Sequence, residues 1–531
     1  MPNRMRACLA SPQFLLALIA AVLSLTVQSG ELGSADTMHR LQTAHSFWTS
    51  EPPVFPNEYP EFGVYGRGGK LYDWYGIGQP LLLLPFDIVG TYIEKLPAFA
   101  AYKGTDPTVR NIFVSATVNT LISVLTALIC FRFLLALEFD THESVAGVLA
   151  LLFCTTHLHY TQNMMENNYI FLLTLTGFLF QYQWRRSGRT RDLLIGSAAL
   201  GLNLLTRLTT ALDVMAVGLL LLLVLWSSEG KQAIWPGIFR YAKTAFPVYL
   251  VFLGIDRLYQ FHRFGTWTDT YVRYFSLKYR ALDPTLPANY PWETPFHVGF
   301  FGALFSREKS IFLFDPLIIL TIAIAAFYWK RLSPQVKAYI AVTLFLVLAY
   351  ICLYARYTVW NGNFAWGDRY VSSAAQMAAF ISVPLLLKYR TELVKFVWMF
   401  ALVIVFASLA IQIASLMFWL PLEIYQADDF GHPQWIIWLR LKNIVAFALG
   451  KTRAWGLVTD SMQYDQWDFQ HSTTWNFLPF VLRRIGEAPS WMTDAAFVLW
   501  SVELILLALT LAKLWSLGLA RIVTKADTSD A

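Results

Sequence analysis

The sequence predicts an all-α polytopic membrane protein with about 12 transmembrane helices and large loops on one side. Three observations support this prediction. Of the 531 residues, 56% are hydrophobic and only 14% are charged, whereas soluble proteins carry about 25% charged residues. The mean hydropathy is +0.46. The apolar residues also gather in runs long enough to enter a bilayer, such as "AVTLFLVLAYICLYARY".

Twelve apolar runs are long enough, or nearly long enough, to cross ~30 Å of hydrocarbon. They lie at 13–28, 111–132, 145–161, 167–184, 192–206, 210–226, 244–258, 310–328, 338–356, 371–388, 396–420 and 494–517. The first run has a second interpretation as a cleaved signal peptide, because Arg4 and Arg6 precede it, but "VQSG" is a poor cleavage site.

Basic segments lie on alternate sides of these runs, and the positive-inside rule makes that side cytoplasmic. They are "MPNRMR", "QWRRSGRTR", "KQAIWPGIFRYAK", "YWKRLSPQVK", "LKYRTELVK" and the C-terminal tail. Both termini are then cytoplasmic. The net charge of +6 is interpreted as this topology signal, so no nucleic-acid partner is expected. The acid-rich connection from Arg132 to Glu143 fits the rule poorly.

The long connections at 29–110, 259–309, 357–370 and 421–493 then all face outward, where chemistry is expected because long loops are usually functional. We divide the chain into a catalytic module at 1–390, which includes the first loop, and C-terminal helices at 391–531. Within the first loop, "PLLLLPFDIVGTYI" is too short to span and is interpreted as an interfacial or re-entrant helix.

Four cysteines occur, in the N-terminal tail or within or beside the apolar runs, so no disulfide framework is expected. They are Cys8, Cys130, Cys154 and Cys352.

Asp36 and Glu166 are the two acidic residues of greatest interest. Asp36 opens an amphipathic segment just after the first run, where it is either a helix N-cap or a functional carboxylate at the membrane surface, with Glu31 as a competitor. Glu166 precedes another run, where the helix dipole alone favours a carboxylate. His157 and His159 stand near it but make a weak metal motif without firm carboxylate partners.

Basic and aromatic residues collect in the outer connections. "DRLYQFHRFGTWTDTYVRYFSLKYR" suits lipid head groups, phosphate or sugar, although interfacial anchoring explains many of its aromatic residues. Lys309 precedes a span, where it can hold a phosphate, and Arg207 ends one, where snorkelling is the alternative. Neither a Walker-type nor a dinucleotide-binding loop occurs in the sequence, so a soluble nucleotide donor is unsupported.

Several motifs together resemble those of a known family. "GALFSREKSIFLFDP", followed about fifty residues later by "WNGNFAWGDRY", resembles the pattern of bacterial membrane glycosyltransferases of the GT-C superfamily, in the group related to protein O-mannosyltransferases and aminoarabinose transferases. "GKLYDWYGIGQPLLLLPFDIVG", "HYTQNMMEN" and "LNLLTRLTT" follow the order of that group. The resemblance covers most of residues 13–390 and implies a GT-C type helical bundle.

The resemblance implies transfer of a sugar from a polyprenyl-phosphate donor to a lipid, glycan or protein acceptor. The reaction would occur at the periplasmic face of the bacterial inner membrane, among membrane lipids. Asp36 is then the catalytic base. The donor phosphate is assigned to Arg369, with Lys309 and Arg207 in support.

The remaining substrate contacts are assigned to Glu166, Trp360, Trp366 and Tyr370, and the two tryptophans either stack on sugar or lie in the membrane interface. Asp368 either orients Arg369 or is its solvated neighbour. No cofactor is assigned, and a divalent metal is left open.

The chain departs from the family pattern at two places. Relatives often carry Lys-Pro-Pro where this chain reads "WYGIGQP", so a phosphate-contacting lysine is missing unless Lys70 or Arg67 replaces it. The first loop also has one Asp at its start where some relatives have two acidic residues.

Two other functions remain as alternatives. The first is a transporter or lipid flippase, which would more often place charges in mid-membrane and show repeated halves. The second is a hydrolase with Asp36 and Glu166 as paired carboxylates. Charges at the ends of the spans, the absence of an obvious sequence repeat and the many spans favour the transferase.

Overall fold

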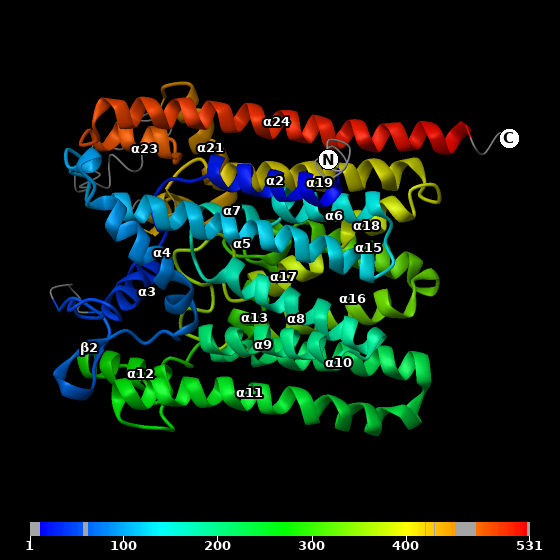
Figure 1. The fold of residues 1–531 in the computed structure, drawn as a ribbon, viewed down its shortest axis with the longest axis horizontal. Coiled ribbons are helices and arrows are strands. Elements are labelled where there is room, and N and C mark those ends of the chain that lie inside the picture. The colour runs from blue at the N-terminus through cyan, green and yellow to red at the C-terminus, as the bar shows by residue number, and fades with distance from the viewer. Residues whose placement is uncertain (1–10, 57–61, 420, 429–430, 452–473, 528–531) are drawn as a thin grey trace, which may run out of the picture.

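The computed structural model describes residues 11–56, 62–419, 421–428, 431–451 and 474–527. Most helices run along the long axis of the molecule, while short helices and loops collect at one end (Figure 1). In the ranges given, the strands are β1 (Val64–Tyr65) and β2 (Leu71–Tyr72), which pair antiparallel with Val64 opposite Tyr72. Cys8, Arg4, Arg6 and part of the 421–493 connection lie outside the described residues.

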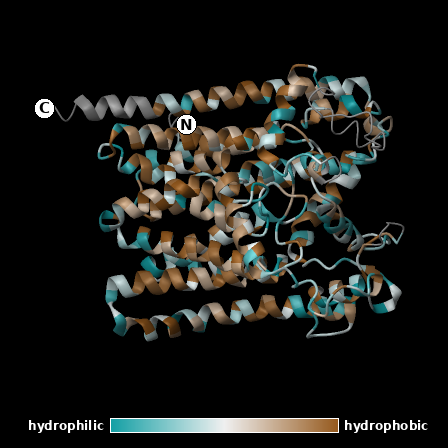
Figure 2. Cartoon of the chain, turned by 180° about the vertical axis from the view of Figure 1, so that it is seen from behind, coloured by the Kyte–Doolittle hydropathy of each residue, from teal (hydrophilic) through white to brown (hydrophobic). Residues whose placement is uncertain are grey.

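Six helical segments in the described part are long and apolar enough to cross a membrane. They are α5 (Val109–Ala136), Leu208–Glu229 with α10 (Ala211–Glu229), Lys231–Phe264 with α11 (Ile234–Phe264), α16 (Pro334–Tyr354), α19 (Lys395–Ser415) and the first part of α24 (Ser490–Asp527). Hydrophobic residues cover these helices and hydrophilic residues gather at the loop end (Figure 2). The chain is therefore described as an integral membrane protein, and the total of about 12 spans stays a prediction.

The other helices are shorter or less apolar. Those along the bundle are α2 (Pro12–Thr26), α6 (Thr141–Cys154), α7 (His157–Gln162), α8 (Asn167–Ser187), α9 (Thr190–Thr206), α14 (Ile311–Phe314), α15 (Leu317–Tyr328), α17 (Ser372–Ala379) and α18 (Ser382–Lys388). Those nearer the loop end are α3 (Ala35–Ser46), α4 (Gly78–Glu94), α12 (Tyr271–Leu282), α13 (Phe296–Phe305), α20 (Leu422–Asp428), α21 (Ile436–Ala448) and α23 (Leu478–Ile485).

Close packing of α8 against α9 forms the centre of the bundle. A Cβ on Gly177 would lie 2.6 Å from Leu200 Cγ, and one on Gly196 would lie 2.7 Å from Gln181 Cγ. Larger side chains at these two glycines would force the helices apart. The resulting rigid pair carries Glu166, just before α8, and Arg207, just after α9, to the loop end.

Three of the predicted spans are broken, and two of the breaks meet at a buried polar cluster. The run at 145–161 breaks between α6 and α7, that at 310–328 breaks before Pro316, and that at 371–388 breaks between α17 and α18. The Asp315 carboxylate accepts hydrogen bonds from Thr156 N at 2.8 Å and Thr156 Oγ1 at 2.9 Å. Gln376 Nε2 donates to Thr156 Oγ1 at 3.2 Å. The breaks at Thr156 and Asp315 thus supply partners for each other, and Gln376 adds a donor from within α17.

The acid-rich connection has a local structural role. Asp140 caps α6 by accepting from Glu143 N at 2.8 Å, and Glu143 accepts in return from Asp140 N at 2.9 Å. This capping box satisfies two backbone donors at the helix start. Asp140 and Glu143 are therefore explained by helix capping, whichever side of the membrane they occupy.

The apolar stretch of the first loop forms helix α4, as expected. Its buried Asp87 accepts from Arg110 Nε at 2.5 Å and from Trp48 Nε1 at 2.8 Å, and lies 2.8 Å from His45 Nδ1. These contacts join α4 to α3 and α5. The first loop is consequently a packed cap on the bundle rather than a loose connection.

The predicted orientation can be tested with single cysteines. Ser50→Cys and Lys70→Cys lie at exposed positions of the first loop, and Arg189→Cys lies at an exposed position between α8 and α9. We expect an impermeant thiol reagent added outside intact cells to label the first two variants and not the third, because the positive-inside rule predicts that the basic connections face the cytoplasm. Labelling is measured against the parental chain and against permeabilised cells. Labelling of Arg189→Cys in intact cells would reverse the orientation.

Candidate active site

A cavity of about 410 Å³ lies at the loop end of the bundle and is lined by segments far apart in the sequence. Its charged lining residues are Asp36, Arg40, Glu166, Arg207, Asp256 and Arg369. Aromatic side chains, among them Trp74, Phe275 and Tyr279, form much of the remaining wall. We call this space the main cavity.

Helix α3 brings Asp36 to the main cavity. The N-cap of α3 is Ser34, whose side chain accepts from Thr37 N at 3.2 Å. Of the two interpretations of Asp36, the one as helix N-cap is therefore wrong, because Ser34 occupies that position. Asp36 lies in the first turn, where Oδ2 accepts from Arg369 Nη1 at 2.8 Å and Oδ1 accepts from Tyr75 OH at 2.5 Å.

Backbone packing fixes the start of α3 against the segment that precedes α8. Gly33 has a φ of +77°, and a Cβ there would lie 2.6 Å from Asn163 Cα. Only glycine permits this approach without strain. Thr37 Oγ1 then donates to the carbonyl of Met164. The contact places Asp36 and Arg40 beside Glu166.

Glu166 is the second carboxylate of the main cavity, and two arginines bind it. Arg40 Nη1 lies 2.5 Å from Oε2, and Arg207 Nη2 contacts Oε1. The side chains of Arg40 and Glu166 are only 4% and 5% exposed. Such a buried pair loses much of its stability if one partner is removed, because the other charge stays buried without compensation.

The charged lining residues balance, three guanidinium groups against three carboxylates, but one carboxylate, Asp256, is neutralised by Arg257, 2.5 Å away, which does not line the cavity. Apart from Asp256, the three guanidinium groups, of Arg40, Arg207 and Arg369, face two carboxylates, of Asp36 and Glu166, which leaves one positive charge in excess. A wall of this composition favours an anionic ligand.

Aromatic rings hold these cations in place. The Arg40 guanidinium lies 4.0 Å from the Tyr75 ring centroid, and those of Arg207 and Arg369 each lie 5.3 Å from the Tyr370 ring centroid. Cation–π contacts of this kind are stronger in desolvated sites.

The protonation states follow from burial and the arginines together. Burial alone would raise the pKa of Asp36, but the Arg369 and Arg40 guanidinium groups outweigh it and hold that pKa below its usual value. Burial would likewise raise the pKa of Glu166, and Arg40 and Arg207 reverse the shift. Both carboxylates are therefore ionised at neutral pH. Burial and the Asp36 charge raise the pKa of Tyr75, which stays a neutral hydrogen-bond donor.

Arg369 is positioned by its own loop and by α8. Asn167 Nδ2 donates to the Arg369 carbonyl and to Ser372 Oγ, both at 2.6 Å. Asp368 accepts from Tyr370 N at 3.0 Å and is buried, which raises its pKa to about 7. Neither interpretation of Asp368 is correct: Arg369 has its ion pair with Asp36, and Asp368 supports the backbone of the loop.

Not every residue assigned from the sequence lines the main cavity. Tyr370 does, but Lys309, Trp360 and Trp366 do not. Lys309 is buried, and its Nζ donates to the carbonyls of Asn363 and Ala365, both at 2.7 Å. Its amine thereby shapes the loop that carries Arg369.

The two tryptophans pack within the protein. Trp366 is 1% exposed and lies against Phe314, with ring centroids 5.1 Å apart. Trp360 packs over α13, where a Cβ on Gly302 would lie 2.2 Å from its ring. Neither tryptophan lines the main cavity, so the structure does not support their assignment as sugar contacts.

Two residues of the site were missed from the sequence, Arg40 and Tyr75. Arg40 follows Asp36 by four residues and so lies on the same face of α3, a spacing that is readable in the sequence. Tyr75 lies in "WYGIGQP", the segment that departs from the family pattern. Glu31, the competitor of Asp36, is paired with Arg484 at 3.1 Å and does not line the main cavity.

A metal ion has no evident ligand set in the described part of the chain. No group of three or more His, Cys, Asp or Glu side chains lies close enough together there to hold one. His157 and His159 are both buried, and Glu166 is bound by arginines.

A second cavity of about 340 Å³ lies on the other side of the Asp36–Arg369 ion pair. Its lining includes Glu31, Phe364 and Trp419, and it shares Asp36, Asn363 and Arg369 with the main cavity. The ion pair is thus part of the wall between two spaces, and we call this one the side cavity.

Comparisons with known proteins give weak similarities only. No protein family model matches the chain, and no curated protein matches its sequence. Among solved structures, the Archaeoglobus fulgidus oligosaccharyltransferase in the apo form aligns with 76% of this chain and 55% of its own, at 12% identity and a TM-score of 0.43. The same protein tethered with an acceptor peptide containing the NVT sequon aligns with 76% and 54%, at 12% identity and a TM-score of 0.40.

A third structure is an archaeal oligosaccharyltransferase from the same organism in complex with an inhibitory peptide and a dolichol-phosphate. It aligns with 76% of this chain and 55% of its own, at 14% identity and a TM-score of 0.39. The chain spans about half the length of these proteins. They belong to the GT-C superfamily, but at such scores the likeness establishes neither a common fold nor a common activity, and the finer relationships implied by the sequence stay predictions.

The buried charge network can be tested through stability. We expect Glu166→Gln to lower the free energy of unfolding by about 3–5 kcal/mol, since Arg40 and Arg207 lose their buried counter-charge. Denaturant-induced unfolding in detergent micelles measures this change. The control is Glu392→Gln, which breaks the exposed Arg331–Glu392 pair and is expected to cost at most about 1 kcal/mol. Equal losses in the two variants would contradict the role of the network.

Proposed function

We propose that the chain is a GT-C type membrane glycosyltransferase that moves a sugar from a polyprenyl-phosphate donor to an acceptor hydroxyl. The observation that carries this proposal is the Asp36 carboxylate, held between Arg369 and Tyr75 on the wall of a cavity with excess positive charge. A base and a phosphate-binding group are then within contact distance of each other.

The donor phosphate is assigned to Arg369 and Arg207, whose guanidinium groups each lie 5.3 Å from the Tyr370 ring centroid. A guanidinium group can bind two phosphate oxygens at once. The excess positive charge can also neutralise part of the charge of a bound phosphate without a further counter-ion. A phosphate bound at Arg369 competes with Asp36 for the guanidinium group, so donor binding weakens the ion pair. Arg40 continues to neutralise Glu166 during this exchange.

In the reaction, the acceptor hydroxyl oxygen bonds to the anomeric carbon of the sugar while the bond from that carbon to the phosphate oxygen breaks. The bonding electrons stay on the phosphate, and the hydroxyl proton passes to Asp36. The departing phosphate has a second pKa of about 6 and needs no separate acid. Arg369 and Arg207 stabilise its charge as it develops.

The two cavities suggest where the substrates lie. The main cavity holds the larger set of arginines and aromatic rings and is assigned to the donor phosphate and sugar. The side cavity reaches the same Asp36 from the opposite face and is assigned to the acceptor, whether lipid, glycan or protein. Asp36 can then receive a proton from one side while the donor occupies the other.

The proposal places the reaction on the side away from the cytoplasm, which the charge distribution of the sequence predicts. The family resemblance implies that this side is the periplasmic face of a bacterial inner membrane. The main cavity does not support the transporter alternative. The arginines and carboxylates of the cavity lie near the ends of the long apolar helices, whereas a transporter more often places charges at their middle.

The function is tested with purified protein, a panel of radiolabelled polyprenyl-phosphate sugars and candidate acceptors. We expect one donor to give transfer, or slow hydrolysis without acceptor. We expect Asp36→Asn to bind that donor yet lose at least ~10²-fold in rate, the lower end of what a positioned base supplies, because an amide cannot accept the proton.

Asp283→Asn is the matched control, because it makes the same change at an exposed position of the same end, and it should keep full activity. Transfer by Asp36→Asn at the normal rate would remove Asp36 from the mechanism. Inertness towards every donor, together with transport of a lipid-linked sugar, would replace the transferase by the flippase.

Arg369→Lys tests the phosphate assignment. We expect weaker donor binding and slower turnover although the charge is kept, because an ammonium group lacks the planar pair of donors that binds two phosphate oxygens. Donor affinity is measured by equilibrium binding of the radiolabelled lipid. Arg280→Lys, at the exposed end of α12, is the control and should bind normally. Unchanged affinity in Arg369→Lys would make Arg369 only a structural partner of Asp36.

A further inference from the structure

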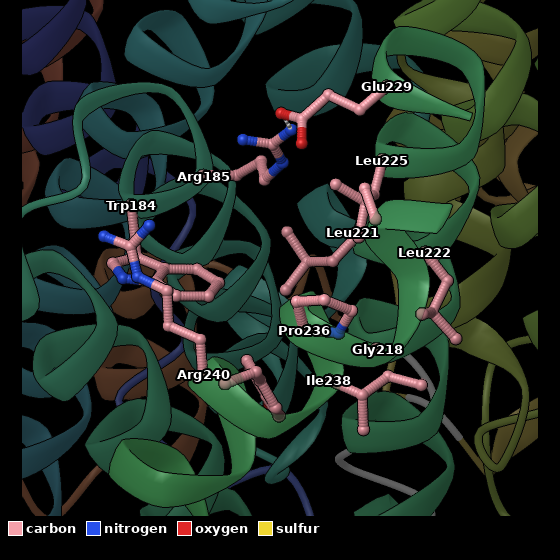
Figure 3. Close-up of a pocket in the computed structure, with 13 residues that line it drawn as sticks. Trp184, Arg185, Gly218, Leu221, Leu222, Leu225, Glu229, Pro236, Ile238 and Arg240 are labelled. Atoms are coloured by element: carbon pink, nitrogen blue, oxygen red, sulfur yellow. Dashed lines mark hydrogen bonds and ion pairs between the residues drawn. The ribbon is translucent and has the colours of Figure 1, made fainter. Parts of the chain in front are cut away.

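A third cavity, of about 440 Å³, lies at the end of the bundle opposite the main cavity. It is enclosed by the last turn of α8, the second half of α10 and the first turns of α11 (Figure 3). Its lining includes Trp184, Arg185, Leu221, Leu225, Ile238 and Arg240. We call it the α10–α11 cavity.

The cavity exists because α10 and α11 diverge after a short turn. The two helices meet near Gly237, where a Cβ would lie 2.4 Å from Leu225 Cδ2. Further along α10, a Cβ on Gly218 would meet nothing within 4 Å. A wedge therefore opens between two helices that both have the length and composition of membrane spans.

The wall of the wedge is apolar, and its rim is charged. Leu221, Leu225 and Ile238 face the space, while Arg185 pairs with Glu229 at the rim (Figure 3). The Arg240 guanidinium lies 5.6 Å from the Trp184 ring centroid, and no hydrogen bond or ion pair joins it to another residue in the described ranges. Two arginines and one glutamate leave one positive charge in excess.

Exposed aromatic residues mark the membrane interface at this level. Trp226, Trp235 and Phe239 are 52%, 77% and 74% exposed on the outer surface of α10 and α11. Tryptophan gathers where the hydrocarbon meets the head groups. The charged rim thus lies at the depth of lipid phosphates and the apolar wall at the depth of acyl chains.

We propose that the α10–α11 cavity binds an anionic phospholipid of the leaflet at this end of the protein. The phosphate contacts Arg240, and one acyl chain lies along Leu221, Leu225 and Ile238. The excess positive charge selects an anionic head group over a zwitterionic one, and the apolar wedge selects a lipid over a free phosphate. This inference is independent of the proposed transferase activity.

Photo-crosslinking tests this site in the full chain reconstituted into nanodiscs. The probes are phosphatidylglycerol and phosphatidylcholine, each with a photoreactive group in one acyl chain, and crosslinked peptides are located by mass spectrometry. We expect phosphatidylglycerol to label residues 218–241 about fivefold more than phosphatidylcholine, which corresponds to about 1 kcal/mol for one arginine near the surface.

Matched variants separate the site from general surface charge. Arg240→Gln should reduce the phosphatidylglycerol signal to the phosphatidylcholine level, whereas Arg191→Gln, at an exposed position of the same end, should keep it. Gly218→Phe, which fills the wedge, should remove labelling by both lipids. Equal labelling by the two lipids, equal loss in the two arginine variants, or labelling unchanged by Gly218→Phe would overturn the proposal.

Discussion

The ion pair between Asp36 and Arg369 is the interaction on which the rest of the site depends. The two residues are 333 positions apart in the chain, and their contact joins the first loop to the loop that follows α16. Once these loops are joined, the space at the loop end is divided into two cavities. The packing of Gly33 and Thr37 against the segment before α8 brings Arg40 beside Glu166 in the same wall. The carboxylate of Glu166 is paired with Arg40 and Arg207, because a buried charge must be compensated.

The sequence allowed much of the site to be predicted, because its charged members stand next to apolar runs. Glu166 and Arg207 adjoin the helices α8 and α9, and Arg369 lies three residues before α17, where a charge beside apolar sequence is costly and therefore informative. Asp36 lies in the amphipathic helix α3, which follows the apolar helix α2. Lys309 has the same surroundings, but its amine is needed by two carbonyls of an irregular loop. The position of a lysine in a sequence motif does not reveal which backbone carbonyls its amine will bind after folding.

The limits of the predicted fold have a similar cause. Hydropathy identified the apolar runs well, yet three of them are broken, and two of the breaks lie where Thr156 and Asp315 meet beside Gln376. A polar residue inside an apolar run signals a break only if its partner is known, and here the partner always belongs to another run. Arg40 was missed for a comparable reason, since its value comes from Glu166, 126 positions away.

Helix α11 relates the height of the main cavity to the thickness of the bilayer. Twenty residues counted from Trp235, at one interface, rise about 30 Å at ~1.5 Å per residue, which is the thickness of the hydrocarbon. That count ends at Gly254, just before Asp256 and Gln260, which line the main cavity. The cavity therefore begins where the hydrocarbon ends, and a lipid-borne phosphate would reach the arginines without leaving its own layer of the membrane.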